Sequence, residues 1–381
     1  MTGVAERAGP LAGLRVIELA GIGPGPYCAM LLADLGADVL RIDRPGPGLP
    51  CAQAGVLERG RRSVLLDLKQ PQAGEVVLRL VERADVLLEG FRPGVMERLG
   101  IGPEACAARN PRLIYGRMTG WGQAGPLAER AGHDINYIAR TGALHGVGPA
   151  TGPPQVPLNL LGDFGGGGLL LAFGVLAALH ERQQSGRGQV VDAAIIDGVA
   201  SFMAMPYSLL ASGMWQDARG VNPLDGSAPD YGVYETSDGK WLAVGALEPR
   251  FFELLVTGLG LTDLPDRSDP RHRATIRRRF AERIRERTRD EWVAVFEGTD
   301  ACVAPVLSMR EAPNDPHLAA RQTYLNRDGV VQPAAAPRFS RTPGRAGATP
   351  SGAGADTVEA LYDWGIEDVQ ELVAAGLAVQ A

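Results

Sequence analysis

The fold is decided near the amino terminus by residues 14–43, LRVIELAGIGPGPYCAMLLADLGADVLRID. The apolar run over 14–20 predicts a buried strand, and the turn over 21–26 is rich in Gly and Pro. A helix is expected over about 27–35, followed by a second strand over 37–43. A strand, a helix and another strand in this order predict a βαβ unit with parallel strands.

The same alternation continues along the chain. One further helix is expected over about 72–83, among strands over 61–69, 84–89 and 112–118. Strands and helices that alternate at this spacing predict the α/β class, with a largely parallel sheet covered on both faces. Because ligands of such sheets bind beyond the carboxyl ends of the strands, a binding site is expected there. This edge includes Arg44, Arg92 and the loop over 119–134.

The first turn partly imitates a dinucleotide-binding fingerprint. Gly21 and Gly23 lie at the right spacing, and the acidic Asp43 follows about twenty residues later. The third glycine position is Pro26, however, and Asp43 is followed at once by Arg44 and a proline. The match fails where helix and strand must approach closely, so a tight strand-to-helix turn explains this stretch without a nicotinamide cofactor.

Acid/base chemistry is suggested by His133 and Asp134, together with Asp163 just ahead of four glycines at 165–168. An imidazole titrates close to neutral pH, and a carboxylate is normally ionised unless burial raises its pKa. Two such groups on opposite faces of a carbon can remove a proton and return it from the other side. The alternative is structural: a surface His-Asp pair, and an Asp that only caps a helix.

Bulk properties narrow the class of protein. At 381 residues the chain is long enough for two domains, and a net charge of −6 makes nucleic acid an unexpected partner. Cys28, Cys51, Cys106 and Cys302 are too widely spaced for a zinc site or a disulfide framework. No secretory leader is evident, and the apolar run over 169–179 is expected to be too short to span a bilayer. A cytoplasmic protein without a membrane partner is therefore expected.

The pattern changes after residue 230. A hairpin with its turn at Asp238 and Gly239 is expected over 234–244, and Pro249 opens a helix. Arginine-rich helical sequence then covers 271–289. A stretch rich in Pro, Ala and Gly follows at 333–356, and a last amphipathic helix is expected over about 366–375.

Several of these segments together resemble a known family. The motifs are residues 14–18 with 23–26, 41–45, 67–69, 90–94, 132–137, 162–167 and 192–194. In this combination the chain resembles the class III CoA transferases (CaiB/BaiF-like), and within them most closely the α-methylacyl-CoA racemase branch. The similarity extends over nearly the whole chain.

The resemblance implies an architecture beyond the α/β class. It implies a Rossmann-like large domain over 1–195, a linker helix over 196–230, a smaller α+β domain over 231–320 and a return segment over 321–381. The family forms interlocked homodimers. The active site then lies between the large domain of one subunit and the small domain of its partner.

The resemblance also implies roles for particular residues. His133, oriented by Glu248, is implied as one catalytic base and Asp163 as the acid/base on the other face of an enolate intermediate. The residues implied to bind CoA or the acyl substrate are Arg44, Leu66, Asp67, Leu68, Lys69, Gly90, Phe91, Arg92, Arg98, Gly132, Asp134, Ile135, Asn136 and Tyr137. An acyl-CoA is then the substrate, in fatty acid and lipid metabolism, and neither a metal nor another cofactor is required.

Two alternatives stay open. In the family's transferases an Asp at the position of Asp134 is the covalent nucleophile, so CoA transfer is the main alternative to racemisation. The chain can also be a CoA-binding protein without catalysis. The motifs leave the acyl chain undefined, and the remaining histidines are expected to be structural or surface residues: His145, His180, His272 and His317.

Overall fold

A computed structural model describes residues 8–46 and 55–381, so Cys51 lies outside the described residues. The chain divides into two compact units. The first contains the chain up to Thr141, Leu158–Phe202 and Gln322–Ala381; the second contains Gly142–Pro157 and Met203–Arg321. Cys28, Cys106 and Cys302 are free thiols.

This division differs from the boundaries expected at 195, 230 and 320. Residues 142–157 and 203–230 were expected in the large domain and a linker helix, yet both group with the second unit. The physical reason is hydrogen bonding by arginines. Arg219 donates to the carbonyls of His145, Pro149 and Gly152. Arg277 donates to the carbonyl of Gly226 and so ties this stretch to the helix that follows.

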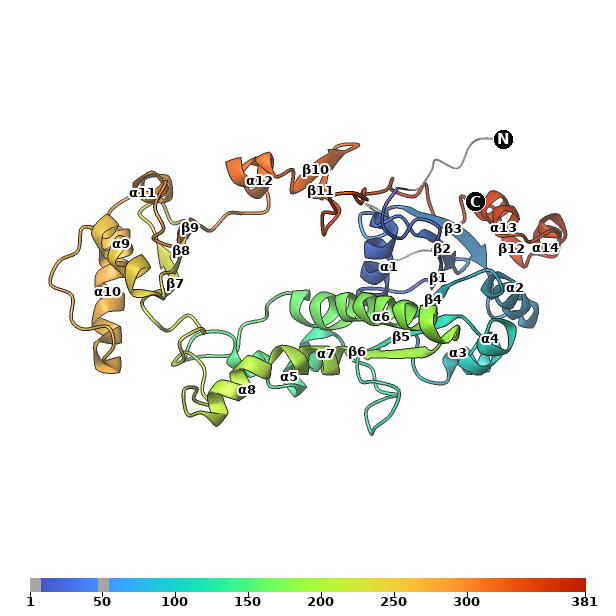
Figure 1. The fold of residues 1–381 in the computed structure, drawn as a ribbon, viewed down its shortest axis with the longest axis horizontal. Coiled ribbons are helices and arrows are strands. Elements are labelled where there is room, and N and C mark those ends of the chain that lie inside the picture. The colour runs from blue at the N-terminus through green and yellow to red at the C-terminus, as the bar shows by residue number, and fades with distance from the viewer. Residues whose placement is uncertain (1–7, 47–54) are drawn as a thin grey trace. The chain divides into compact units, whose positions relative to one another are not determined.

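The first unit is built on a seven-stranded sheet in the order β12-β3-β2-β1-β4-β5-β6 (Figure 1). The strands are β1 (Arg15–Leu19), β2 (Asp38–Asp43), β3 (Arg61–Leu66), β4 (Val86–Glu89), β5 (Ile114–Thr119), β6 (Val190–Ala194) and β12 (Ala378–Val379). All neighbours are parallel except β12, which runs antiparallel to β3. The predicted α/β fold with a largely parallel sheet is confirmed, and the order 3-2-1-4-5-6 is that of the Rossmann fold.

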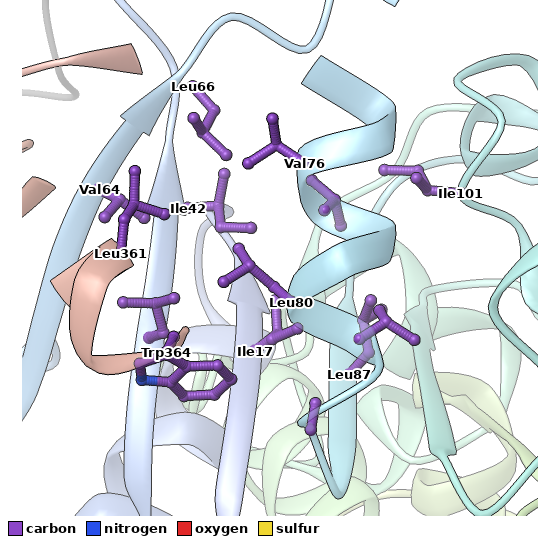
Figure 2. Close-up of a cluster of buried hydrophobic side chains, with 14 of the residues drawn as sticks. Ile17, Ile42, Val64, Leu66, Val76, Leu80, Leu87, Ile101, Leu361 and Trp364 are labelled. Carbon is purple, nitrogen blue, oxygen red and sulfur yellow. The ribbon is translucent and has the colours of Figure 1, made fainter. Parts of the chain in front are cut away.

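Helices cover both faces of this sheet. The helices of the unit are α1 (Pro24–Asp34), α2 (Pro71–Val81), α3 (Val95–Arg98), α4 (Pro103–Arg109), α5 (Asp134–Arg140), η3 (Leu160–Leu169), α6 (Leu170–Ser185), α7 (Ile195–Phe202), α13 (Thr357–Asp363) and α14 (Val369–Ala374). On one face, alternate strand residues pack against α2 and α13 (Figure 2). Ile17, Ile42 and Leu87 meet Leu80 and Trp364 there, all at most 2% exposed. On the other face lie α1 and α6.

One long helical stretch departs from the expectation that Asp163 precedes a helix. Residues Leu160–Leu169 form the π-helix η3, which continues directly into α6, so Asp163 lies inside a helix and not at its cap. The stretch Leu160–Ser185 is long and apolar enough to cross a bilayer by length and composition alone. The apolar run over 169–179 was expected to be too short to span a bilayer because that run leaves out η3. The helix packs on α1, α7 and the sheet.

A buried arginine fastens the return segment to the first unit. Arg59 donates to both carboxylate oxygens of Asp34, to Oε1 of Gln332 and to the carbonyl of Pro333. Gln332 and Pro333 belong to β11 (Val330–Pro333), which forms a hairpin with β10 (Tyr324–Arg327). The segment that links the two units is thus anchored by charge inside the large domain.

The second unit has its own sheet and core. Its strands are β7 (Tyr231–Glu235), β8 (Trp241–Gly245) and β9 (Val303–Pro305), and its helices are α8 (Ala204–Ala211), α9 (Pro249–Leu259), α10 (Arg273–Ile284), α11 (Arg289–Phe296) and α12 (Pro316–Ala320). The hairpin of β7 and β8 agrees with the predicted turn at Asp238 and Gly239. The arginine-rich stretch forms α10 and reaches the first residue of α11. Ile276 and Phe280 of α10 and Trp292 of α11 are buried in the core of this unit.

Candidate active site

The residues singled out in the first unit gather at the carboxyl edge of the parallel sheet. Arg44 follows β2, Asp67 follows β3, Gly90 follows β4 and Gly120 follows β5. The strand order reverses between β1 and β4, which is where ligands of such sheets bind. Gly21 and Gly23, after β1, therefore stand at this point together with the loop after β4.

Asp163, on η3, lies beside Gly23 of the turn after β1. Its carboxylate oxygen Oδ2 accepts a hydrogen bond from Nδ2 of Asn159 at 3.3 Å. Burial raises the pKa of the Asp163 carboxyl group above its ordinary value; the Asn159 hydrogen bond lowers it, the charge of Asp134 raises it and His133 lowers it. His133 is therefore close enough for its charge to act on Asp163.

Gly23 explains why the first turn needs glycine. Its backbone has a φ of +68°, and a Cβ atom there would lie 3.2 Å from Oδ2 of Asp163. A side chain at this position would crowd the carboxylate as well as strain the turn. The glycine turn after β1 thus provides space for an acidic side chain.

Asp134 holds Asp163 in place. Asp134 is 5% exposed, and its Oδ2 accepts the backbone N–H of Asp163 at 2.7 Å. That N–H belongs to the first turn of η3, where backbone donors lack helical partners. Gly162 makes the approach possible, since a Cβ atom there would lie 2.3 Å from Oδ2 of Asp134. The Asp134 carboxylate is therefore a structural acceptor between α5 and η3.

His133 directly precedes Asp134 and lies at the N-cap position of α5. Its backbone N–H donates to Oδ1 of Asn136 at 3.0 Å, while the residue itself is exposed. Asn136 thus has a capping role at the start of α5. Ile135 is 41% exposed. The imidazole is accessible, as a group that exchanges protons with a ligand must be.

Tyr137 links this centre to the loop after β4. The tyrosine is 8% exposed, and its ring packs edge-on against Trp121 at a centroid distance of 4.7 Å. Glycines at 120 and 132 make room for the Tyr137 ring, since a Cβ atom at either would lie within 2.7 Å of it. Burial raises the pKa of Tyr137, the charge of Asp163 raises it further and the charge of Arg92 lowers it. Tyr137 is therefore close enough to Asp163 and to Arg92 for both charges to act on it.

The residues expected to bind CoA divide into exposed cations and structural positions. Exposed cations at the carboxyl edge are Arg44, Lys69, Arg92 and Arg98. Leu66 is fully buried, and Leu68 and Phe91 pack against the hydrophobic core. Oδ1 of Asp67 accepts the backbone N–H of Lys69 at 3.2 Å, which shapes the turn after β3. The side chains of the apolar residues pack in the core, so these residues can contact a ligand only through their backbone. The cations present their charge to solvent.

Glu248 lies in the second unit, and its expected pairing with His133 stays a prediction. It immediately precedes α9. The turn before it is held by Arg267, which donates to the carbonyls of Ala246 and Leu247 and pairs with Asp230 at 2.6 Å. The backbone that carries Glu248 is therefore fixed within its own unit.

Sequence reasoning missed Asn159 and Arg267, and gave Gly23 no role at the site. Asn159 lies four residues before Asp163, a spacing that on a helix brings side chains together, but the glycine-rich stretch had not suggested a helix there. The other two act on residues far away in the sequence, so no local signal marks them.

Comparison with known proteins agrees with this fold. Residues 11–357 match CoA-transferase family III. The chain is 46% identical to human alpha-methylacyl-CoA racemase over 87% of both chains. It is 34% identical to the succinyl-CoA–D-citramalate CoA-transferase of Chloroflexus aurantiacus, over 88% of this chain and 89% of that one. A crystal structure of a CAIB/BAIF family protein from Brucella suis superposes with a TM-score of 0.81 at 28% identity, and covers 94% of this chain and 100% of that one.

A Rossmann-type sheet with His133, Asp134 and Asp163 at its carboxyl edge defines the class as an α/β protein. The chain belongs to CoA-transferase family III. The family includes both racemases and transferases.

Proposed function

We propose that the protein is an α-methylacyl-CoA racemase, an isomerase that interconverts (R)- and (S)-2-methylacyl-CoA thioesters. His133 and Asp163 act as acid and base on opposite faces of the α carbon. One group removes the α proton to give an enolate, and the other returns a proton from the opposite face. Glu248 is proposed to orient His133. The similarity to a racemase at 46% identity supports this assignment.

The observation that carries the proposal is an exposed histidine close enough to a half-buried carboxylate for its charge to act on it. The raised pKa of Asp163 brings its proton affinity nearer to that of an imidazole, which suits a group that both takes and returns a proton. Clefts in which burial and neighbouring charge shift such groups are typical of catalytic sites.

CoA transfer through Asp134 is the second candidate. The family and its transferase members support it, and Asp134 is present. The contacts of Asp134 speak against it, because an attacking carboxylate must reach a thioester carbon. Here Asp134 is 5% exposed, and one of its oxygens is occupied by the N–H of Asp163.

The proposal extends to the cofactor, the surroundings and the assembly. The reaction is proposed to need no cofactor beyond the CoA of the substrate, and the protein to act in the cytoplasm in fatty acid metabolism. An interlocked homodimer is proposed as the working state. The apolar side chains Leu160, Leu169 and Phe173 on η3 and α6 are each more than half exposed, as expected of a surface that a second copy covers.

Substitution at the three central residues tests the reaction. His133→Ala and Asp163→Ala are each expected to lower inversion of 2-methylacyl-CoA by about 10²- to 10⁴-fold, the usual contribution of a positioned acid or base. Asp134→Asn keeps an oxygen to accept the Asp163 N–H, so inversion should stay within about tenfold of the wild type. Measured inversion that survives both alanine variants, or a transferase activity that Asp134→Asn abolishes, would overturn the proposal.

A further inference from the structure

The loop after β4 is bracketed by two acidic residues that share one arginine. Glu89 is the last residue of β4, Glu97 lies in α3, and the loop between them carries Arg92. Arg117 stands on the neighbouring strand β5, directly opposite Glu89 in the register of the sheet. These three side chains therefore enclose the base of the loop.

Arg117 bonds both acids at once. Its Nε donates to Oε1 of Glu89 at 2.9 Å, and its Nη1 donates to Oε1 of Glu97 at 2.8 Å. The other oxygen of Glu89 accepts the backbone N–H of Phe91 at 2.7 Å. One guanidinium thus fixes the end of β4, the first turn of the loop and the short helix α3.

The ion pair between Glu89 and Arg117 is buried, so each group depends on the other for its charge to be compensated. Glu89 is 2% exposed and Arg117 is 7% exposed. Burial raises the pKa of Glu89 to about 7, while the Phe91 N–H and Arg117 act in the opposite direction. If Glu89 lost Arg117, an unpaired charge would remain buried, which is energetically costly. The loop would then have to rearrange to relieve that cost. Lysine cannot replace the fork, because one ammonium group lacks the planar donors that reach two acids.

The pairing also determines the charge that the loop presents. Glu89 is the acid nearest to Arg92 in the sequence and Glu97 the acid nearest to Arg98, and both are already paired with Arg117. Arg92 and Arg98 remain exposed. Exposed guanidinium groups at the carboxyl edge of the sheet suit the phosphates of a nucleotide.

We propose that Arg117, through Glu89 and Glu97, is a positioning residue that sets the β4–α3 loop for binding the phosphates of CoA. The inference rests on the proposed function only in taking an acyl-CoA as the ligand. Arg117 contacts no substrate; it acts through the backbone of Phe91 and the placement of Arg92 and Arg98.

The test is calorimetric titration of the full-length protein with CoA. Arg117→Lys is expected to raise the Kd for CoA by about tenfold or more, since one ammonium cannot replace the two-sided fork. Glu97→Gln weakens only the more exposed of the two ion pairs of Arg117, the one with Glu97, and is expected to raise the Kd by a smaller factor. Arg182→Lys is the matched control, because Arg182 pairs with Asp85 just before the opposite end of β4 at 2.9 Å. It should bind CoA as the wild type does.

Steady-state kinetics of Arg117→Lys distinguish a displaced loop from a general loss of structure. At saturating substrate, kcat for α-proton exchange by Arg117→Lys is expected to stay within about threefold, while KM rises with the Kd. CoA binding by Arg117→Lys and Glu97→Gln equal to that of the wild type overturns the inference, as does a wild type that does not bind CoA. A wild type that binds CoA without exchanging the α proton refutes the racemase and leaves this test intact.

Discussion

Asp163 is a carboxylate on which burial and three neighbours act in different directions. Burial and Asp134 raise its pKa, whereas Asn159 and His133 lower it. The balance lies on the raised side, which makes the group a better proton acceptor once it is ionised. The same residue is held by its backbone N–H, so its position and its proton affinity are set by separate contacts.

Removing the Asn159 amide should move the pH dependence. Asn159→Ala loses a hydrogen bond that lowers the pKa of Asp163, so the pKa rises further. Asp163 must be ionised to accept a proton, and the acid limb of the exchange rate should therefore shift to higher pH. The measurement is a pH–rate profile of α-deuterium exchange. Asn326→Ala, on the exposed surface of β10, serves as the control. An acid limb that stays in place or moves to lower pH contradicts the assignment.

The sequence identified the candidate residues but not the contacts that hold them in place. His133, Asp134 and Asp163 stand in motifs that the sequence displays, and the structure places all three at one edge. The contact of Gly23 with Asp163 joins segments far apart in the chain, and no local pattern encodes it.

At the scale of elements, the glycine run is a packing device inside a helix. The N–H of Phe164 bonds to the carbonyl of Asn159, five residues earlier, as in a π-helix. Gly166 approaches α7, and Gly168 approaches the backbone of Pro24 in α1. Any side chain there would push η3 away from its neighbours, and Asp163 is carried on η3.

A pair of glycine substitutions tests this packing. In Gly198→Ala the new Cβ atom would lie 2.0 Å from the carbonyl oxygen of Gly166, so the free energy of unfolding should fall by about 1–3 kcal/mol or more. Exchange activity should fall as well, because η3 shifts. Gly25→Ala in α1 is the control, since a Cβ atom at this position would have no neighbour within 4 Å. Urea unfolding measures both; equal stability of the two variants contradicts the packing account.

The βαβ units were predictable because strands and helices with buried faces leave strong periodic patterns. The π-helix was not, since a run of glycines normally indicates a loop and only close packing with α1 and α7 stabilises it here. The edge strand β12 has two residues and likewise lacks a pattern.

For the whole molecule, the strand order brings segments from distant parts of the chain to one edge. Loops after β1, β2, β3, β4 and β5 converge there because parallel strands end on the same side. The boundaries of the units were less predictable than the sheet. Residues 142–157 join the second unit through side-chain bonds of Arg219 that no composition change marks.

The exposed apolar side chains of η3 and α6 lead us to predict a dimer. Light scattering coupled to size exclusion should give twice the 40.3 kDa chain mass for the wild type. Phe173→Glu places a charge on a side chain that is 68% exposed in the single chain, and should weaken the dimer if that face is covered. Gln184→Glu, exposed on the same helix, should leave the mass unchanged. A monomeric wild type contradicts the proposed homodimer.

The central claim is proton transfer at the α carbon by His133 and Asp163. The most direct measurement is deuterium incorporation at that carbon in D₂O, starting from (R)- and (S)-2-methylacyl-CoA separately and without an acceptor acid. Incorporation and inversion are expected from both enantiomers. No incorporation from either, together with CoA transfer once a carboxylic acid is added, would contradict it and assign the protein to the transferases of its family.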